Sequence, residues 1–206
     1  IKNAWSVGQT AHRLFERSIA LRNNGQLPVV LGGDHSIACG SVAAALAVDP
    51  DVGVLWVDAH ADINTPDSSL SMNMHGMPLA FLMGLVDPIT VVGFEWMVNI
   101  PVLPPRRLVY VGLRDIDPAE LVAIRSLGIT SFTMHDVGRF GIQNVMQQAM
   151  ASAVDGERPD PSDDRGKSAR QKSAGRAGHA TRDQTPFRCT GTESTVGRGR
   201  DAAERG

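Results

Sequence analysis

The sequence has little of several features that mark large classes of protein. Its 20 Lys and Arg residues are balanced by 22 Asp and Glu, so a net charge of −2 offers no basic surface of the kind that binds nucleic acid. No apolar run reaches the roughly 18 residues that a membrane-spanning helix needs. Two cysteines, Cys39 and Cys189, are too few for a disulfide framework. We therefore expect a protein whose partners are neither nucleic acids nor membranes.

The N-terminus also lacks the pattern of a secretory signal. The chain begins Ile1-Lys2-Asn3, without an initiator Met and without a basic segment followed by an apolar one. Together with the low cysteine content, this predicts a cytoplasmic protein, and the start itself suggests that residues of the natural chain precede Ile1.

The last quarter of the chain has almost no apolar residues. Over residues 155–206, Phe187 and Val196 are the only members of the Val, Ile, Leu, Met, Phe, Trp and Tyr set. Such a segment buries too little apolar area to offset an ordering cost of about 1–2 kcal/mol per residue. We predict a folded domain over residues 1–159 and a disordered tail over residues 160–206.

The first 154 residues alternate between helix and strand signals. Short apolar runs are typical of buried parallel strands, and apolar residues at spacings of three and four are typical of helices. Strands are predicted over residues 27–31, 52–57, 107–111 and 129–133, and helices over residues 7–23, 36–47, 76–85, 119–127 and 137–154. This alternation predicts an α/β fold with a parallel sheet, in which ligands bind at the carboxyl ends of the strands.

Polar clusters follow three of the predicted strands directly, at residues 32–36, 58–64 and 114–118. The second cluster is the most informative, because Asp58, His60 and Asp62 alternate along an extended segment and so project to one side. An imidazole and two carboxylates without a thiolate suit manganese, iron(II) or zinc. The row predicts a metal site in which Asp58 could bridge two ions. The alternative is a solvated loop rich in Asp and His.

His35 follows the neighbouring predicted strand and is placed to complete the same ligand set. Asp34, just before it, has two interpretations that the sequence leaves open. It either orients the His35 imidazole or caps the helix that begins near Ser36.

Four motifs, in this order, resemble those of the ureohydrolases and among them the arginases. They are Gly-Gly-Asp-His-Ser at 32–36, Trp-Val-Asp-Ala-His-Ala-Asp-Ile-Asn-Thr-Pro at 56–66, Ser-Met-Asn-Met-His-Gly-Met-Pro at 71–78 and Gly-Leu-Arg-Asp-Ile-Asp-Pro-Ala-Glu at 112–120. The resemblance covers residues 1 to about 159. It implies a three-layer α/β/α fold and a binuclear manganese enzyme that hydrolyses L-arginine to L-ornithine and urea.

The resemblance also implies roles for individual residues. His35 and Asp62 correspond to ligands of one manganese ion, His60 to a ligand of the other, and Asp58 to a carboxylate that both ions share. A hydroxide held between two cations would attack the guanidinium carbon, because the ions generate hydroxide near neutral pH and stabilise the developing charge. His75 corresponds to a proton-shuttle histidine. The alternative for His75 is a residue at a helix start without a role.

The loop after the metal row distinguishes arginases from their relatives. Arginases hold the substrate α-carboxylate, which agmatinase substrates lack, at positions matched here by Asn64, Ser69, Ser71 and Asn73. Asp117, with Glu120 beside it, matches the residue that takes the α-ammonium. The resemblance thus favours L-arginine over the substrates of agmatinase or formimidoylglutamase. Met72 replaces the usual family glycine, and a positive φ at this position would strain a methionine.

The family's second metal motif, Asp-x-Asp within Ser-Phe-Asp-x-Asp-x-x-Asp-Pro, is absent where the resemblance ends. It is expected on a strand a few residues after Pro159, but the chain continues there with Asp160-Pro161-Ser162. A single inserted base could produce these residues from codons for Ile-His-Leu, so we interpret the tail as an out-of-frame translation. Asp163 and Asp164 are adjacent and would point to opposite faces of a strand.

This absence has functional consequences. A half-built ligand set is expected to bind metal weakly, so we predict little or no arginase activity for the 206-residue chain. The homotrimer that the family commonly forms is not expected for it. A different class of function also stays open, that of a non-catalytic product that associates with intact arginase subunits.

Overall fold

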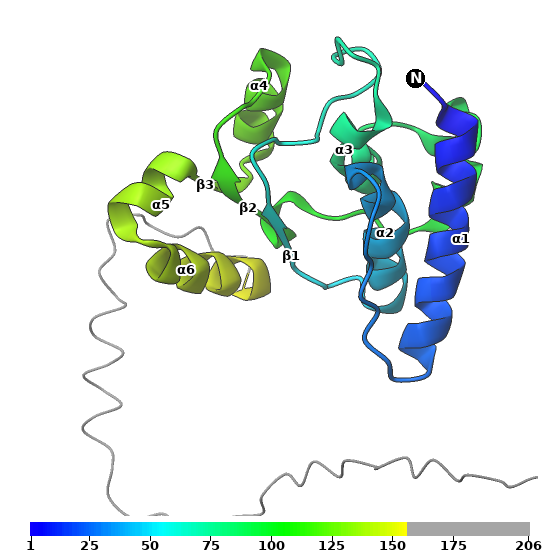
Figure 1. The fold of residues 1–206 in the computed structure, drawn as a ribbon, viewed down its shortest axis with the longest axis horizontal. Coiled ribbons are helices and arrows are strands. Elements are labelled where there is room, and N and C mark those ends of the chain that lie inside the picture. Colours follow the sequence, from blue (N-terminus) through cyan, green and yellow to red (C-terminus); the bar gives the residue numbers. More distant parts are fainter. Residues whose placement is uncertain (156–206) are drawn as a thin grey trace, which may run out of the picture. The chain divides into compact units, whose positions relative to one another are not determined.

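The computed structural model describes residues 1–155 (Figure 1). The tail expected over residues 160–206 lies outside this part of the chain. The helices are α1 (Ala4–Asn23), α2 (Ala38–Val48), α3 (Pro78–Leu82), α4 (Pro118–Leu127), α5 (Met134–Phe140) and α6 (Ile142–Asp155), and the strands are β1 (Val54–Val57), β2 (Leu108–Leu113) and β3 (Thr130–Thr133). Among these residues, no helix is both long and apolar enough to cross a membrane.

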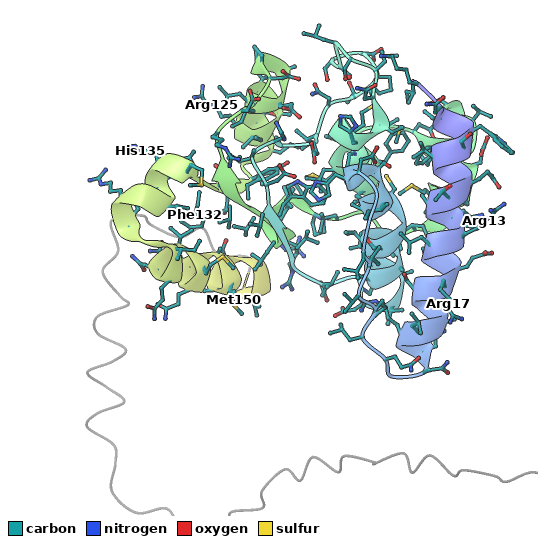
Figure 2. All side chains as sticks on the ribbon, viewed as in Figure 1. Arg13, Arg17, Arg125, Phe132, His135 and Met150 are labelled. Carbon is teal, nitrogen blue, oxygen red and sulfur yellow. The ribbon has the colours of Figure 1, made fainter. Side chains whose placement is uncertain are left out.

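The three strands form one parallel sheet in the order β1-β2-β3, which confirms the predicted α/β class. Side chains alternate across β2, as the period of a strand requires. Leu108 and Tyr110 pack into a core that helices α1 to α4 share, whereas Val109 and Val111 pack with Phe132 against α5 and α6. The sheet is therefore the middle of three layers. Arginines on the far side of α1 point away from this core (Figure 2).

The prediction of a strand over residues 27–31 is wrong. This segment is extended but belongs to no sheet, and the side chains of Leu27, Val29 and Leu31 are 76–89% exposed. A strand exists only where a second strand completes its hydrogen bonds, and no strand among residues 1–155 lies against this one.

The helix predicted over residues 137–154 is two helices. Gly141 separates α5 from α6 with a φ of 78°, a conformation that glycine adopts without steric cost and that ends a helix. The helix predicted over residues 76–85 is also shorter. A 3-10 turn at Met74–Gly76 leads into α3, which begins with Pro78 at its first position.

The crossing of α1 and α2 depends on a glycine. A Cβ at Gly40 would lie 2.4 Å from the Ala11 carbonyl oxygen, so the two helix backbones could not keep their distance. We expect Gly40→Ala to lower the free energy of unfolding by about 1–3 kcal/mol through overpacking, measured by chemical denaturation. The control is Gly138→Ala in α5, where a Cβ meets nothing within 4 Å. That variant should gain roughly 0.5–1 kcal/mol from helix propensity, and an equal response of both variants would contradict the packing argument.

Candidate metal centre

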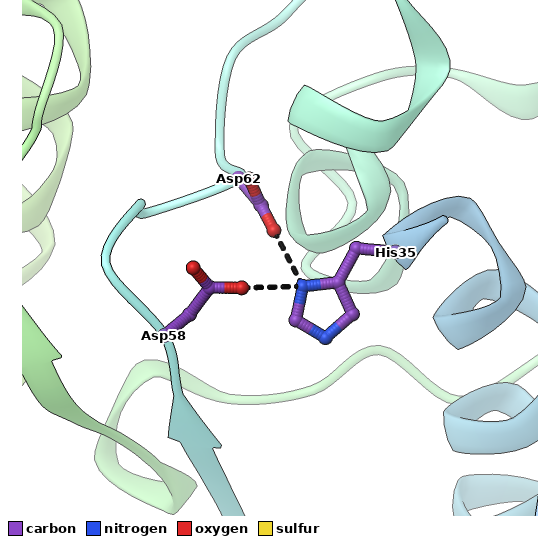
Figure 3. Close-up of side chains that lie close together, drawn as sticks. All are labelled: His35, Asp58 and Asp62. Carbon is purple, nitrogen blue, oxygen red and sulfur yellow. Dashed lines mark hydrogen bonds and ion pairs between the residues drawn. The ribbon is translucent and has the colours of Figure 1, made fainter. Parts of the chain in front are cut away.

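His35, Asp58 and Asp62 meet at the carboxyl end of β1 (Figure 3). His35 begins a 3-10 turn after Gly33, Asp58 directly follows β1, and Asp62 is buried in the segment beyond it. The Nδ1 atom of His35 lies 2.8 Å from an oxygen of each carboxylate. One donor atom from each residue lies within 4.8 Å of the others. One imidazole and two carboxylates at this spacing could hold a divalent metal ion.

His60 lies on the other side of Asp58. Its Nδ1 atom is 3.3 Å from the Asp58 Oδ1 atom, and its Nε2 atom is 3.5 Å from a carboxylate oxygen of Asp115. The side chain of His60 is more than half exposed. Asp58 therefore turns one oxygen toward His35 and the other toward His60.

Contacts within this cluster shift the pKa values of His35 and Asp58. The hydrogen bond to Asp62 raises the pKa of His35, against the opposing effect of burial, and the nearby Asp58 charge adds to the rise. Burial alone would raise the pKa of Asp58, but the hydrogen bond from the His60 backbone N–H and the His35 charge outweigh it, so this pKa is lowered. The His35 ring and the Asp58 carboxylate thus favour each other's charged forms.

Residues outside the predicted set hold the loop of residues 58–64 in place. The Trp56 ring stacks on the His35 imidazole with 4.1 Å between centroids. Tyr110, the partner of Trp56 in the sheet register, donates a 2.8 Å hydrogen bond from its hydroxyl to the Ala61 carbonyl. Sequence reasoning missed both aromatic residues, and only their places on strands that end at the cluster could have indicated them.

Glu120 ties the same loop to the start of α4. Its side chain is buried, and its two carboxylate oxygens accept hydrogen bonds from the backbone N–H of Ile63 at 3.1 Å and of Asp117 at 3.0 Å. Burial raises the pKa of Glu120, although both hydrogen bonds favour its charged form. In this structure the carboxylate contacts the backbone of two loops, the first of which carries Asp62.

Asp34 caps the turn that contains His35. One of its oxygens accepts hydrogen bonds from the Ser36 N–H at 3.0 Å and from the Ser36 hydroxyl at 2.5 Å, and the hydroxyl bond lowers the pKa of Asp34. The second oxygen lies 3.8 Å from the Nδ1 atom of His75, whose side chain is half exposed. Of the two interpretations of Asp34, the structure shows the capping contact.

The predicted substrate residues divide into two groups. Asn64 is buried and donates a 2.9 Å hydrogen bond from Nδ2 to Asp117, while its Oδ1 atom accepts from Ser68, a residue that sequence reasoning missed. In the second group, side-chain hydroxyls stabilise the turn itself. The Ser69 hydroxyl accepts from Met72 N–H at 3.0 Å and the Ser71 hydroxyl from Asn73 N–H at 3.3 Å.

Met72 stands where the family has glycine, and its φ is positive, at 58°. Its side chain also packs partly against the core, so two truncations must be compared to isolate the backbone effect. We expect Met72→Gly to be more stable than Met72→Ala by about 1 kcal/mol, because both lose the packing and only alanine keeps a Cβ in the left-handed region. Thermal or chemical denaturation of both variants measures this, and a more stable Met72→Ala would contradict it.

Comparisons with known proteins agree on one family. The Arginase family matches residues 4–160. The arginase of Eremothecium gossypii is 47% identical over 151 residues, which cover 73% of this chain and 37% of that protein. Arginase-1 of Homo sapiens is 42% identical over 155 residues, which cover 73% of this chain and 47% of that protein. The chain thus spans less than half the length of these curated relatives.

Solved structures show the same likeness. Arginase from Bacillus caldovelox superposes with a TM-score of 0.70 at 36% identity, over 75% of this chain and 51% of that one. Entamoeba histolytica arginase in complex with L-ornithine gives a TM-score of 0.67 at 35% identity, over 74% and 52% of the two chains. The family match extends over most of the chain, and the relatives are well above 30% identical over nearly three quarters of it, so the chain belongs to the arginase family.

Proposed function

We propose that residues 1–155 form the larger part of an arginase site, which binds manganese and L-arginine for hydrolysis to L-ornithine and urea. The observation that carries this proposal is the meeting of His35, Asp58 and Asp62 at the carboxyl end of β1, in a chain of the arginase family. Carboxylate and imidazole donors without sulfur favour manganese over softer metals.

Two ions could be held here, with Asp58 as a ligand of both. His35 and Asp62 would hold one ion and His60 the other, since the two Asp58 oxygens already face the two histidines. When bound, the ions lower the pKa of water and stabilise negative charge that develops on the guanidinium carbon substituents. His75, half exposed and close to Asp34, is free to pass a proton to the leaving amine.

Neutral hydrogen-bonding groups would select the amino-acid end of the substrate. We assign the α-carboxylate of L-arginine to Asn64, Ser69, Ser71 and Asn73, and its α-ammonium to Asp117 with Glu120 positioning the backbone behind it. The ornithine complex of the Entamoeba enzyme supports an amino acid as ligand, because ornithine is the product of arginine hydrolysis. This assignment favours arginine over agmatine, which has no α-carboxylate to fill the Asn and Ser set.

The 206-residue chain by itself is proposed to be inactive, because it has no second Asp-x-Asp pair beyond the family segment to complete both ions. The test is urea release from L-arginine with added Mn²⁺, with full-length human Arginase-1 as the positive control. We expect no urea above the protein-free background. A rate comparable to that of the full-length enzyme would show that the described residues suffice.

A further inference from the structure

The place of the His35 ring is not set by the sheet. The extended segment before it, residues 27–31, pairs with no strand in the described part of the chain. Helix α2 anchors the backbone that follows His35, but a backbone anchor leaves the side-chain torsions free. The Nδ1 atom of His35 lies 2.8 Å from an oxygen of Asp58 and of Asp62 all the same, so a further contact must hold the ring.

Trp56 offers a face for this ring. In β1 its side chain is 4% exposed, and the sheet register places it beside Tyr110. The indole stacks on the His35 imidazole, with 4.1 Å between the ring centroids and 25° between the ring planes. Stacked aromatic rings attract each other beyond the area that they bury. This contact therefore fixes the plane of the imidazole.

The period of the strand brings the indole and a carboxylate to the same ring. Asp58 continues β1 by donating its N–H to the Val111 carbonyl at 3.1 Å, so Trp56 and Asp58 project to one side, whereas Leu55 packs on the opposite face of the sheet. The indole covers the face of His35, and the carboxylate meets its edge at Nδ1 (Figure 3). Trp56 sets the plane of the ring, and the carboxylates set its rotation within that plane.

The indole acts here through its ring and not through its N–H group. The Nε1 atom of Trp56 is buried and has no hydrogen-bond partner among residues 1–155. A buried donor without a partner contributes no stability. A phenyl ring at this position should therefore keep the contact with His35, and an aliphatic side chain should lose it.

We propose that Trp56 is a positioning residue of the metal centre, whose ring face holds the His35 imidazole with Nδ1 directed at Asp58 and Asp62. The proposal rests on the proposed function for its effect on metal affinity and on the stacking alone for the placement of the ring. A ligand that is already oriented loses less freedom when an ion binds. The indole thereby raises the affinity for the ion without touching it.

The experiment measures Mn²⁺ affinity by calorimetric titration of the full 206-residue chain and three variants. Trp56→Leu should weaken binding by about tenfold, as expected when a group that orients a ligand is lost. Trp56→Phe should stay within about threefold of the unmodified chain, because it keeps a ring face. The control is Phe94→Leu, which truncates another buried aromatic ring of the same core, packed against Phe81. It should lower stability but leave the affinity within about twofold.

Proton resonances of the metal-free chain separate this proposal from the proposed function. The ring current of a stacked indole shifts the carbon-bound protons of His35 upfield. These signals, assigned by their absence from His35→Asn, should return toward those of the other histidines in Trp56→Leu. Because the upfield shift is measured on the unmodified chain, the test holds even if Trp56→Leu fails to fold.

Two results would overturn the proposal. They are His35 signals without an upfield shift in the unmodified chain, and a folded Trp56→Leu variant that binds Mn²⁺ as tightly as the unmodified chain. Upfield signals in a chain that binds no Mn²⁺ would support the placement of His35 by Trp56 and contradict the proposed function alone.

Discussion

Glu120→Ala is expected to lower the free energy of unfolding by about 1–3 kcal/mol. Its carboxylate is the acceptor for the backbone N–H groups of Ile63 and Asp117. The hydrogen bond from Ile63 is buried, and a buried donor left without a partner costs about 1–3 kcal/mol, whereas Asp117 is exposed and its N–H can bond to water. Part of this loss is offset, because the variant no longer buries a carboxylate whose pKa burial raises. Chemical denaturation followed by circular dichroism measures the change.

Two matched variants locate the effect. Glu120→Gln keeps one acceptor oxygen but turns an N–H donor toward the second backbone N–H. Its free energy of unfolding should therefore fall by about half as much as that of Glu120→Ala. Glu16→Ala removes an exposed glutamate from α1 and should change stability by less than about 0.5 kcal/mol. If Glu120→Ala were no more destabilising than Glu16→Ala, the hydrogen bonds of Glu120 would not hold the loop of residues 58–64 against α4.

Asp58→Asn is expected to weaken Mn²⁺ binding by more than about tenfold, the loss typical of residues that merely orient a ligand. The substitution removes both the negative charge and one of the oxygens that face His35 and His60. Stability should change little, because ion pairs of a partly exposed carboxylate contribute little in water. Calorimetric titration with Mn²⁺ gives the affinity.

Asp67→Asn is the control for charge alone. It removes a carboxylate from an exposed residue of the loop that follows the cluster, outside the ligand group. The affinity for Mn²⁺ should stay within about twofold of the unmodified chain, since an exposed charge at a distance is screened by salt. Equal losses in both variants would mean that Mn²⁺ responds only to the net charge of this region.

Local signals predicted most of the fold. Asp117 and Pro118 marked the start of α4, and the apolar runs that became β1, β2 and β3 each found a parallel neighbour. The run at residues 27–31 is similarly apolar but remains unpaired. Apolar composition indicates that a segment favours burial, but it does not show whether a neighbouring strand is present to pair with it. The break at Gly141 was missed, since the apolar spacing continues through it while the backbone turns to positive φ.

The cluster could be anticipated only where ligands follow strands. Asp58 comes directly after β1, so its place at the carboxyl end of the sheet follows from topology. His35 follows an apolar run that pairs with no strand among residues 1–155, so strand pairing does not account for its place beside Asp58. The contacts of Glu120 could not be found in this way. Its partner Ile63 lies 57 residues earlier and contributes a backbone N–H, which has no signature in the sequence.

The metal content of the purified chain is the sharpest test of the proposed incomplete manganese site. Equilibrium dialysis of the 206-residue protein against increasing Mn²⁺ gives the number of bound ions and their affinity. We predict saturable, weak binding of one ion by His35, Asp58 and Asp62, which a chelator removes readily. Two bound ions that remain after dialysis against a chelator would contradict the incomplete site. An absence of saturable Mn²⁺ binding at any concentration would contradict a metal site altogether.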